Sequence, residues 1–274
     1  MGLKWIGRNV TGGLFNVQEQ VTYTKLGEPG HPEYNLFFNT LITADIGQKW
    51  NVGVNLPVAY KYLVDPNKLG VPGVTPPTDF TNSGIGDINL LVTRKLGRIN
   101  SLLLTGILGV PTGVYDAHIT PLKYASLSQQ IGFGEVTGSL TLDQTLDQMW
   151  GLIVLGGNAA WRGGENRIHN YRPPSGTLYG YAGYFLGPLV PALGLSVTGF
   201  TGHDRDQDQA QKTPFFSMAV NPSIEWSTTW LALLVAASFP YGYDGIGQDP
   251  NGAPRSKWRF FPWTVSFGVA IAPF

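Results

Sequence analysis

The densest group of charged side chains in the chain is HDRDQD at 203–208. Aspartates at alternate positions resemble the start of a calcium-binding loop, whose oxygen ligands hold a hard divalent cation. Such a loop also needs glycine at its sixth position and glutamate at its twelfth, where this chain has Gln209 and Phe215. A solvated loop is therefore the preferred interpretation. No metal is expected, and the only weak candidate ligands are Asp204, Asp206 and Asp208.

Catalytic chemistry has few other residues to use. The four histidines all fall in segments predicted to be loops, and they are His31, His118, His169 and His203. None has a serine or cysteine set beside it as a nucleophile. The absence of cysteine excludes a disulfide framework and c-type haem attachment. The GIG at 84–86 precedes a predicted strand and no helix, so it is not a nucleotide-binding loop. We predict that the chain is not an enzyme and binds no cofactor.

The most regular polar residues belong to an alternating pattern. From Trp50 to Tyr62, large apolar residues occupy every second position, and Asn51, Asn55 and Lys61 are among the residues between them. Alternation with a period of two places the two sets on opposite faces of a β-strand. About thirteen residues of strand are enough to cross a bilayer at a tilt of about 45°. One face of this strand is therefore predicted to meet lipid and the other a polar interior.

The composition supports a membrane barrel. Only 13% of the 274 residues are charged, against about 25% in ordinary soluble domains. No segment approaches the roughly 18 consecutive apolar residues of a spanning helix. The formal net charge of zero argues against nucleic acid as a partner. The start of the chain lacks the apolar core of a signal peptide, so we expect that such a signal has been removed.

Similar alternating segments recur along the chain, and we predict an all-β, transmembrane, antiparallel up-and-down β-barrel of about twelve strands. The connections alternate between short and long, as periplasmic turns and extracellular loops do in outer-membrane barrels. Residues 1–13 are assigned to a periplasmic N-terminal segment and 14–274 to the barrel. The predicted strands are 14–25, 34–46, 50–62, 85–96, 101–111, 131–143, 149–161, 177–186, 192–202, 215–226, 229–241 and 258–273.

Aromatic residues gather near both ends of these strands, as expected at the two membrane interfaces. Trp50, Trp150, Trp226 and Trp230 are assigned to the short-turn end. The other group is assigned to the long-loop end: Trp161, Trp258, Trp263, Tyr23, Tyr34, Tyr60, Tyr62, Tyr179, Tyr181, Phe239 and Tyr241.

Some residues resist the pattern. Glu19 falls on the apolar face of its strand. Pro57, Pro222 and Pro262 lie within predicted strands, where bulges would have to accommodate them.

The more polar face of the strands is predicted to line the barrel interior. A twelve-stranded barrel has an interior of intermediate width. It is wider than that of an eight-stranded barrel, which side chains fill, and narrower than the open channel of a porin. We favour a narrow pore over an interior that is simply filled. Lys61 against Asp87, Glu135 and Glu225 suggests at most a mild cation preference. The predicted pore-lining residues are Asn39, Asn51, Asn55, Lys61, Asp87, Asn89, Thr93, Glu135, Thr137, Asn221 and Glu225.

Several motifs, in the order GLFNVQEQVTYTK, IGQKWNVGVNLPVAYKY, GIGDINLLVTRKL and GVPTGVYD, resemble a known family. The family is that of the outer-membrane barrels of the MetA pathway of phenol degradation, also called transporter-like barrels. The resemblance covers most of 13–245, and GIGD and PTG-x-Y are its most telling parts. It implies passage of small compounds, with aromatic or other hydrophobic compounds as candidates. Related channels of functional-amyloid secretion are trimeric twelve-stranded barrels, and the terminal Phe274 is similar to the aromatic residue that outer-membrane assembly reads.

Two functions remain open on this basis. The first is a porin-like channel in the bacterial outer membrane for passive diffusion of small solutes. The second is a structural or partner-holding barrel, part of a secretion or electron-transfer complex, without an open pore. The expected partners are outer-membrane lipid, lipopolysaccharide and small solutes, with a homo-trimer as a further possibility and no nucleic acid.

Overall fold

The computed structural model describes residues 15–26, 33–63, 80–96, 102–120, 123–124, 130–206, 209–210, 215–228, 231–243 and 258–271. Predictions that concern the segment 1–13, His31, Asp208, Trp230 and Phe274 lie outside these residues.

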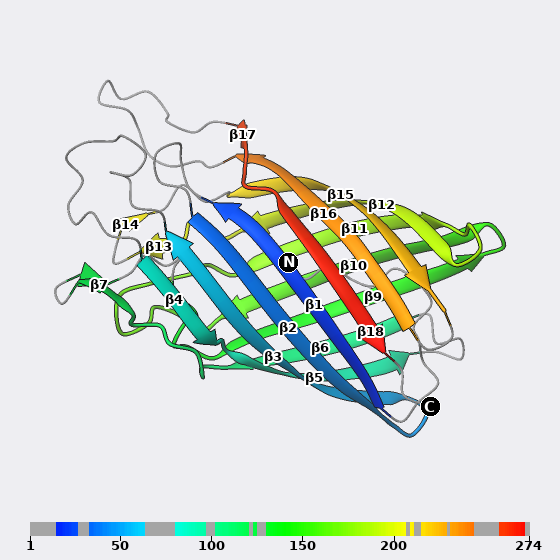
Figure 1. Cartoon of the computed structure of the whole chain (residues 1–274), viewed down its shortest axis with the longest axis horizontal. Coiled ribbons are helices and arrows are strands. Elements are labelled where there is room, and N and C mark those ends of the chain that lie inside the picture. The colour runs from blue at the N-terminus through cyan, green and yellow to red at the C-terminus, as the bar shows by residue number, and fades with distance from the viewer. Residues whose placement is uncertain are drawn as a thin grey trace.

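The described strands form one closed antiparallel barrel (Figure 1). Neighbouring strands along the chain pair with one another, and closure comes from the pairing of the first strand, β1, with the last, β18. Twelve strands make up this wall, two of them interrupted into β4–β5 and β17–β18. They are β1 (Phe15–Leu26), β2 (Glu33–Ile46), β3 (Trp50–Leu63), β4 (Phe80–Ile85) with β5 (Ile88–Leu96), β6 (Leu102–Val110), β9 (Thr137–Gln148), β10 (Gly151–Arg162), β11 (Ser175–Tyr184), β12 (Leu189–Phe200), β15 (Phe216–Ser227), β16 (Leu231–Tyr243), and β17 (Trp258–Phe260) with β18 (Thr264–Ile271).

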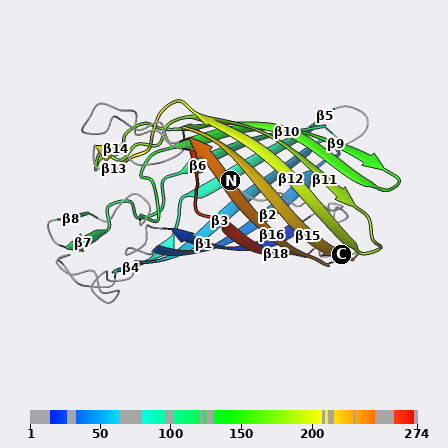
Figure 2. The same cartoon turned by 90° about the horizontal axis from the view of Figure 1, so that it is seen from above.

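Two small hairpins lie outside the wall, at one end of the barrel (Figure 2). They pair β7 (His118–Thr120) with β8 (Lys123–Tyr124), and β13 (Arg205–Asp206) with β14 (Gln209–Ala210). The part of the chain that the structure describes contains no helix with the length and hydropathy of a membrane span.

Alternation of side chains separates the inside of the barrel from the outside. On β12, Leu193, Leu195 and Val197 are exposed, whereas Ser196 and Thr198 between them are buried. A strand with period-two patterning presents its residues alternately to two faces, and in a membrane barrel the apolar face meets lipid. The exposed leucines and valines are therefore the lipid-facing surface, and the buried polar residues face the interior.

The two ends of the barrel differ in their connections. Pairs such as β2–β3, β9–β10 and β11–β12 are joined by two to four residues, at 47–49, 149–150 and 185–188. Gly47 and Gly187, in two of these turns, have left-handed backbone with φ of 64° and 62°, which glycine adopts without a steric penalty. We call this the short-turn end, and the opposite end the long-loop end.

Two predicted strands have different boundaries in the structure. The strand predicted at 131–143 is wrong in its start and end, since β9 runs from Thr137 to Gln148. The strand predicted at 85–96 begins earlier, at Phe80, and is broken at 86–87. Both errors fall where the wall departs from regular pairing, which a local alternation pattern cannot reveal. The other predicted strands agree with the structure to within about three residues at either end.

Each of the three prolines lies at an interruption of the strand pairing. Pro57 faces the break between β4 and β5, and its carbonyl accepts a hydrogen bond from Gly86 N at 2.7 Å. Pro222 lies where the β15–β16 register is interrupted between Val220 and Ser223, and Pro262 lies between β17 and β18. Because proline has no N–H to donate, these are the positions at which a sheet tolerates it.

The wall at 86–87 continues through irregular chain rather than through a regular pair of strands. The amides of Ile131 and Gly132 both donate to the Val114 carbonyl, at 3.1 and 2.9 Å. Gly113 and Gly132 approach so closely that a Cβ on Gly113 would lie 2.7 Å from Gly132 Cα. We call the residues 84–88, 111–115 and 130–136 the wall kink.

Replacing Gly132 with alanine should destabilise the barrel, because the new Cβ would overlap the Gly113 backbone. We expect a loss of about 1–3 kcal/mol, typical of overpacking. Urea unfolding in lipid vesicles, followed by tryptophan fluorescence, measures it. Gly106→Ala is the matched control, since a Cβ on Gly106 would have no neighbour within 4 Å. Equal midpoints for the two variants would contradict the close approach.

Candidate functional site

Seven of the residues predicted to line the interior lie on the inward faces of the strands. Asn39, Asn51, Asn55, Asn89 and Thr93 lie on the inward faces of β2, β3 and β5, partly buried. Asn221 and Glu225 of β15 are 3% and 2% exposed. Their role as pore lining stays a prediction.

A charged group lies at the short-turn end of β2, β3 and β5. Asn51 donates to the Asp45 carboxylate at 3.0 Å, and Lys95 Nζ lies 3.8 Å from the same carboxylate. Asp45 and Lys95 were absent from the predicted lining, although both are polar residues on the inward face. Their spacing from Asn51 depends on strand register, which the sequence alone did not supply.

Hydroxyl and amide side chains bridge neighbouring strands around the interior. Such cross-strand pairs satisfy polar groups within the wall and stabilise its register. These pairs include Thr22–Ser266 at 3.0 Å, Thr93–Thr105 at 3.0 Å, Thr141–Asn158 at 2.7 Å, Thr177–Thr198 at 3.0 Å and Ser196–Asn221 at 3.2 Å.

An aromatic and aliphatic cluster lies on the inward faces of β10, β11 and β12. Leu152, Val154 and Tyr181 are buried in it, with Tyr179 packed against them. The Tyr179 hydroxyl donates to Asp143 of β9, and its ring lies 5.8 Å from that of Tyr181. The assignment of Tyr179 and Tyr181 to the outer aromatic girdle is therefore wrong.

Glycines on the neighbouring strands make room for these two inward-facing rings. A Cβ on Gly156 would lie 2.5 Å from the Tyr179 ring, and one on Gly194 would overlap the Tyr181 ring. Each tyrosine is directly opposite its glycine on the neighbouring strand. The flat rings cover bare backbone, as aromatic residues do opposite glycine in designed sheets.

The girdles contain the other aromatic pairs. At the long-loop end the Tyr34 ring lies 6.4 Å from Tyr23 and 6.5 Å from Tyr62, and Trp263 lies 6.3 Å from Tyr23. At the short-turn end Trp150 stacks on Tyr184 at 6.4 Å. These are the depths at which amphipathic rings favour a membrane interface.

Asp87 holds the wall kink together. Its Oδ1 accepts from Gly113 N at 2.9 Å and its Oδ2 from Phe133 N at 2.8 Å. The Thr112 hydroxyl donates to the Gly86 carbonyl at 2.8 Å and accepts from Ile88 N at 3.0 Å. Side chains thus replace the missing strand-to-strand bonds, and the Asp87 carboxylate is committed to backbone rather than to a solute.

Glu135 and Thr137 lie at the edge of the same region. Glu135 comes before β9 rather than within it, and its Cβ is 2.7 Å from the position that a Cβ on Gly163 would take. Thr137 is the first residue of β9 and pairs with Gly109 and Arg162.

The connection between β10 and β11 folds into a compact, partly buried turn. Asn170 and Asn166 are 0% and 4% exposed. The Asn166 Oδ1 accepts from the amides of Ile168 and Asn170 at 3.1 and 2.9 Å, and its amide donates to the Phe133 carbonyl at 2.6 Å. Asn166 therefore joins this turn to the wall kink.

The candidate metal ligands do not assemble within the described residues. Asp204 lies near Arg162, Arg172 and His203, which lower its pKa, but burial has the larger effect and raises it. A carboxylate among cations is a counter-charge rather than a cation ligand. No group of three potential ligand side chains occurs in the described chain, and the Asp206 side chain and Asp208 lie outside it.

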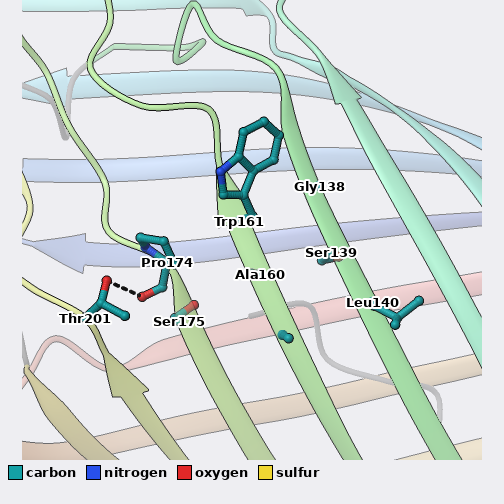
Figure 3. A pocket seen from close by; sticks show the side chains of 9 residues that line it. Gly138, Ser139, Leu140, Ala160, Trp161, Pro174, Ser175 and Thr201 are labelled. Atoms are coloured by element: carbon teal, nitrogen blue, oxygen red, sulfur yellow. Dashed lines mark hydrogen bonds between the residues drawn. The ribbon is translucent and has the colours of Figure 1, made fainter.

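An apolar groove of about 500 Å³ lies on the outside of the wall near the long-loop end. Figure 3 shows Trp161 and Leu140 projecting on either side of Ala160 and Ser139, with Pro174 and Thr201 beyond. Leu140 and Trp161 are 55% and 53% exposed, so the groove faces the lipid side. It does not form part of the interior.

One acidic residue also faces outward. Glu19 pairs with Val269 and Thr40 across β18 and β2, on the face that carries Phe38 and Phe267. Thr40 donates its hydroxyl to the Glu19 carboxylate at 2.5 Å, which supplies one hydrogen bond in place of water.

No protein-family model matches the sequence, and no curated protein matches it either. Solved structures match it in fold. The COG4313 outer membrane channel from Pseudomonas putida F1 matches with a TM-score of 0.64 at 13% identity, over 94% of this chain and 95% of that one. The translocator domain of autotransporter NalP from Neisseria meningitidis matches with a TM-score of 0.52 at 11% identity, over 98% and 91%. The beta domain of the Bordetella autotransporter BrkA matches with a TM-score of 0.51 at 10% identity, over 95% of this chain and 99% of that one.

These identities are low, so the likeness concerns the fold. The chain is an all-β, closed, twelve-stranded antiparallel barrel of the type found in bacterial outer membranes.

Replacing Asp87 with alanine should loosen the wall kink, because two backbone amides would lose a charged acceptor. We expect a stability loss of about 2–4 kcal/mol, and faster hydrogen exchange at Gly113 and Phe133. Asp116→Ala, an exposed aspartate of the adjacent connection, is the control. Unchanged exchange at both amides would show that the carboxylate does not hold the kink.

Proposed function

We propose that this chain is an outer-membrane channel through which small solutes diffuse passively. The observation that carries the proposal is the polar inward face of a closed barrel, with amide, hydroxyl and charged side chains placed where water or a solute would pass. Diffusion through polar and constricted zones needs no coupled energy source.

Two constrictions would set the size of the solute. The wall kink and the turn at 163–174 narrow the long-loop end, where Asn166 joins them. The cluster around Tyr179 and Tyr181 narrows the short-turn side. Its rings also offer apolar surface, which suits aromatic or other hydrophobic compounds of small size.

The resemblance to the MetA-pathway-of-phenol-degradation barrels supports the same proposal. Its two most telling motifs, GIGD at 84–87 and PTGVY at 111–115, come together at the wall kink through Asp87 and Gly113. We therefore propose that the chain belongs to that family. The homo-trimer that related channels suggest stays a prediction, which the native mass of the detergent-solubilised protein tests.

A structural or partner-holding barrel is the second candidate function. The deep burial of Glu225, Asn221 and Ser196, at 2–3% exposure, favours it, because side chains that fill an interior leave little room for solutes. Recovery of a stoichiometric partner with the barrel would favour this candidate over the channel.

Single-channel recording in a planar bilayer tests the channel directly. We expect small, steady conductance from folded protein, and a severalfold increase in Tyr181→Ala, because the variant removes a buried ring from the interior. Tyr184→Ala is the matched control, since Tyr184 lies on the same strand but is 52% exposed on the outer face. Absence of conductance from protein that is folded would overturn the proposal.

A further inference from the structure

Three cationic side chains meet at the long-loop end of the interior, although they are far apart in the sequence. Lys61 ends the inward face of β3 and is 5% exposed. Arg162 is the last residue of β10, on the inward face that carries Leu152 and Val154. Arg172 belongs to the turn at 163–174 and interacts electrostatically with both of the others. We call these three residues the cation cluster.

The cluster is held by neighbours from several elements. Lys61 donates to the carbonyl of Gln130 in the wall kink, and its Nζ lies 5.4 Å from the centre of the Phe37 ring. The Arg172 guanidinium lies 5.6 Å from the centre of the Phe133 ring. Stacking on a ring fixes the plane of a guanidinium and leaves its edge free to donate hydrogen bonds.

One donor of the cluster has no acceptor in the part of the chain that the structure describes. The Nε of Arg172 is buried and has no hydrogen-bond partner among the described residues. Leaving a buried donor of a charged group unpaired is costly, so this position favours an additional acceptor. A carboxylate suits it, because its two oxygens can accept in parallel from Nε and a terminal nitrogen.

Nearby carboxylates balance the charge only in part. Glu33 acts on Lys61, and Asp204 acts on Arg162 and Arg172. Burial raises the pKa of Asp204. Counted by formal charge, the three cations exceed these two carboxylates by one, and they lie beside two phenylalanine rings.

We propose that Lys61, Arg162 and Arg172 form a binding site for the carboxylate of a small organic solute, at the long-loop end of the interior. Phe133, 5% exposed, and Phe37 supply an apolar wall for an aromatic or aliphatic body. The site deepens the proposed channel function and rests on it for its physiological meaning. It also replaces the mild cation preference predicted from the sequence with a preference for anions at this end.

Fluorine NMR titration of para-fluorobenzoate into the purified, detergent-solubilised barrel tests the site without requiring conductance. We expect binding of the carboxylate and at least about tenfold weaker binding of neutral para-fluorobenzamide, which has nearly the same shape. Arg172→Met should weaken benzoate binding by about tenfold, the loss expected for one charge-assisted contact. Arg167→Met is the matched control, because Arg167 lies in the same turn but is exposed.

Equal binding of acid and amide, or wild-type affinity in Arg172→Met, would overturn the proposed site. Should Arg172→Met fail to fold, as judged by loss of its heat-modifiable band, Arg162→Gln and Lys61→Met carry the same expectation. Binding without conductance in the bilayer would refute the channel and leave the site standing. Conductance without selective binding would refute the carboxylate site and leave the channel standing.

Discussion

The structure depends on hydrogen-bond closure of the wall. In the hydrocarbon region of a membrane, backbone N–H and C=O groups have no water to bind, so a sheet can cross only if it has no free edge. Pairing of the first strand, β1, with the last, β18, supplies that closure. Once the ring is closed, each strand has one lipid-facing side and one interior side, and the alternation of the sequence follows from this.

Where the regular pairing fails, side chains restore it. Asp87 and Thr112 bind backbone groups at the wall kink that a continuous ladder would have paired. Pro57 lies opposite this break, where the wall does not need the N–H that proline lacks, and its carbonyl accepts from Gly86. The kink is therefore a built feature, in which the lost ladder is replaced by charged and hydroxyl acceptors and by the close contact of two glycines.

The period-two pattern was enough to predict the barrel, its number of strands and most inward positions. The stretch from Trp50 to Tyr62 is the clearest example, since its apolar and polar residues separate as the alternation requires. The assignment of Tyr179 and Tyr181 to the girdle failed because it rested on their place along the strand. Both share the inward face of β11 with Thr177. Gly156 and Gly194 opposite leave room for their rings, and those pairings are known only once the register is. The prediction of a strand at 131–136 failed because the path of this irregular segment depends on a distant residue. Asp87, some 45 residues earlier, binds the Phe133 amide.

The interior is unequal along its length, and this inequality bears on transport. In the proposed channel, a solute entering from the long-loop end would come first to the region of Arg172 and the buried Lys61, where charge and aromatic rings adjoin. It would then pass hydroxyl and amide pairs such as Thr177–Thr198, and last the aromatic cluster near the short-turn end. Charge at the entrance raises the local concentration of ions of opposite sign, whereas weak, successive polar contacts let them move on. An interior of this kind would concentrate small organic anions at its mouth without holding them along its length, and for a passive channel that combination favours flux over retention.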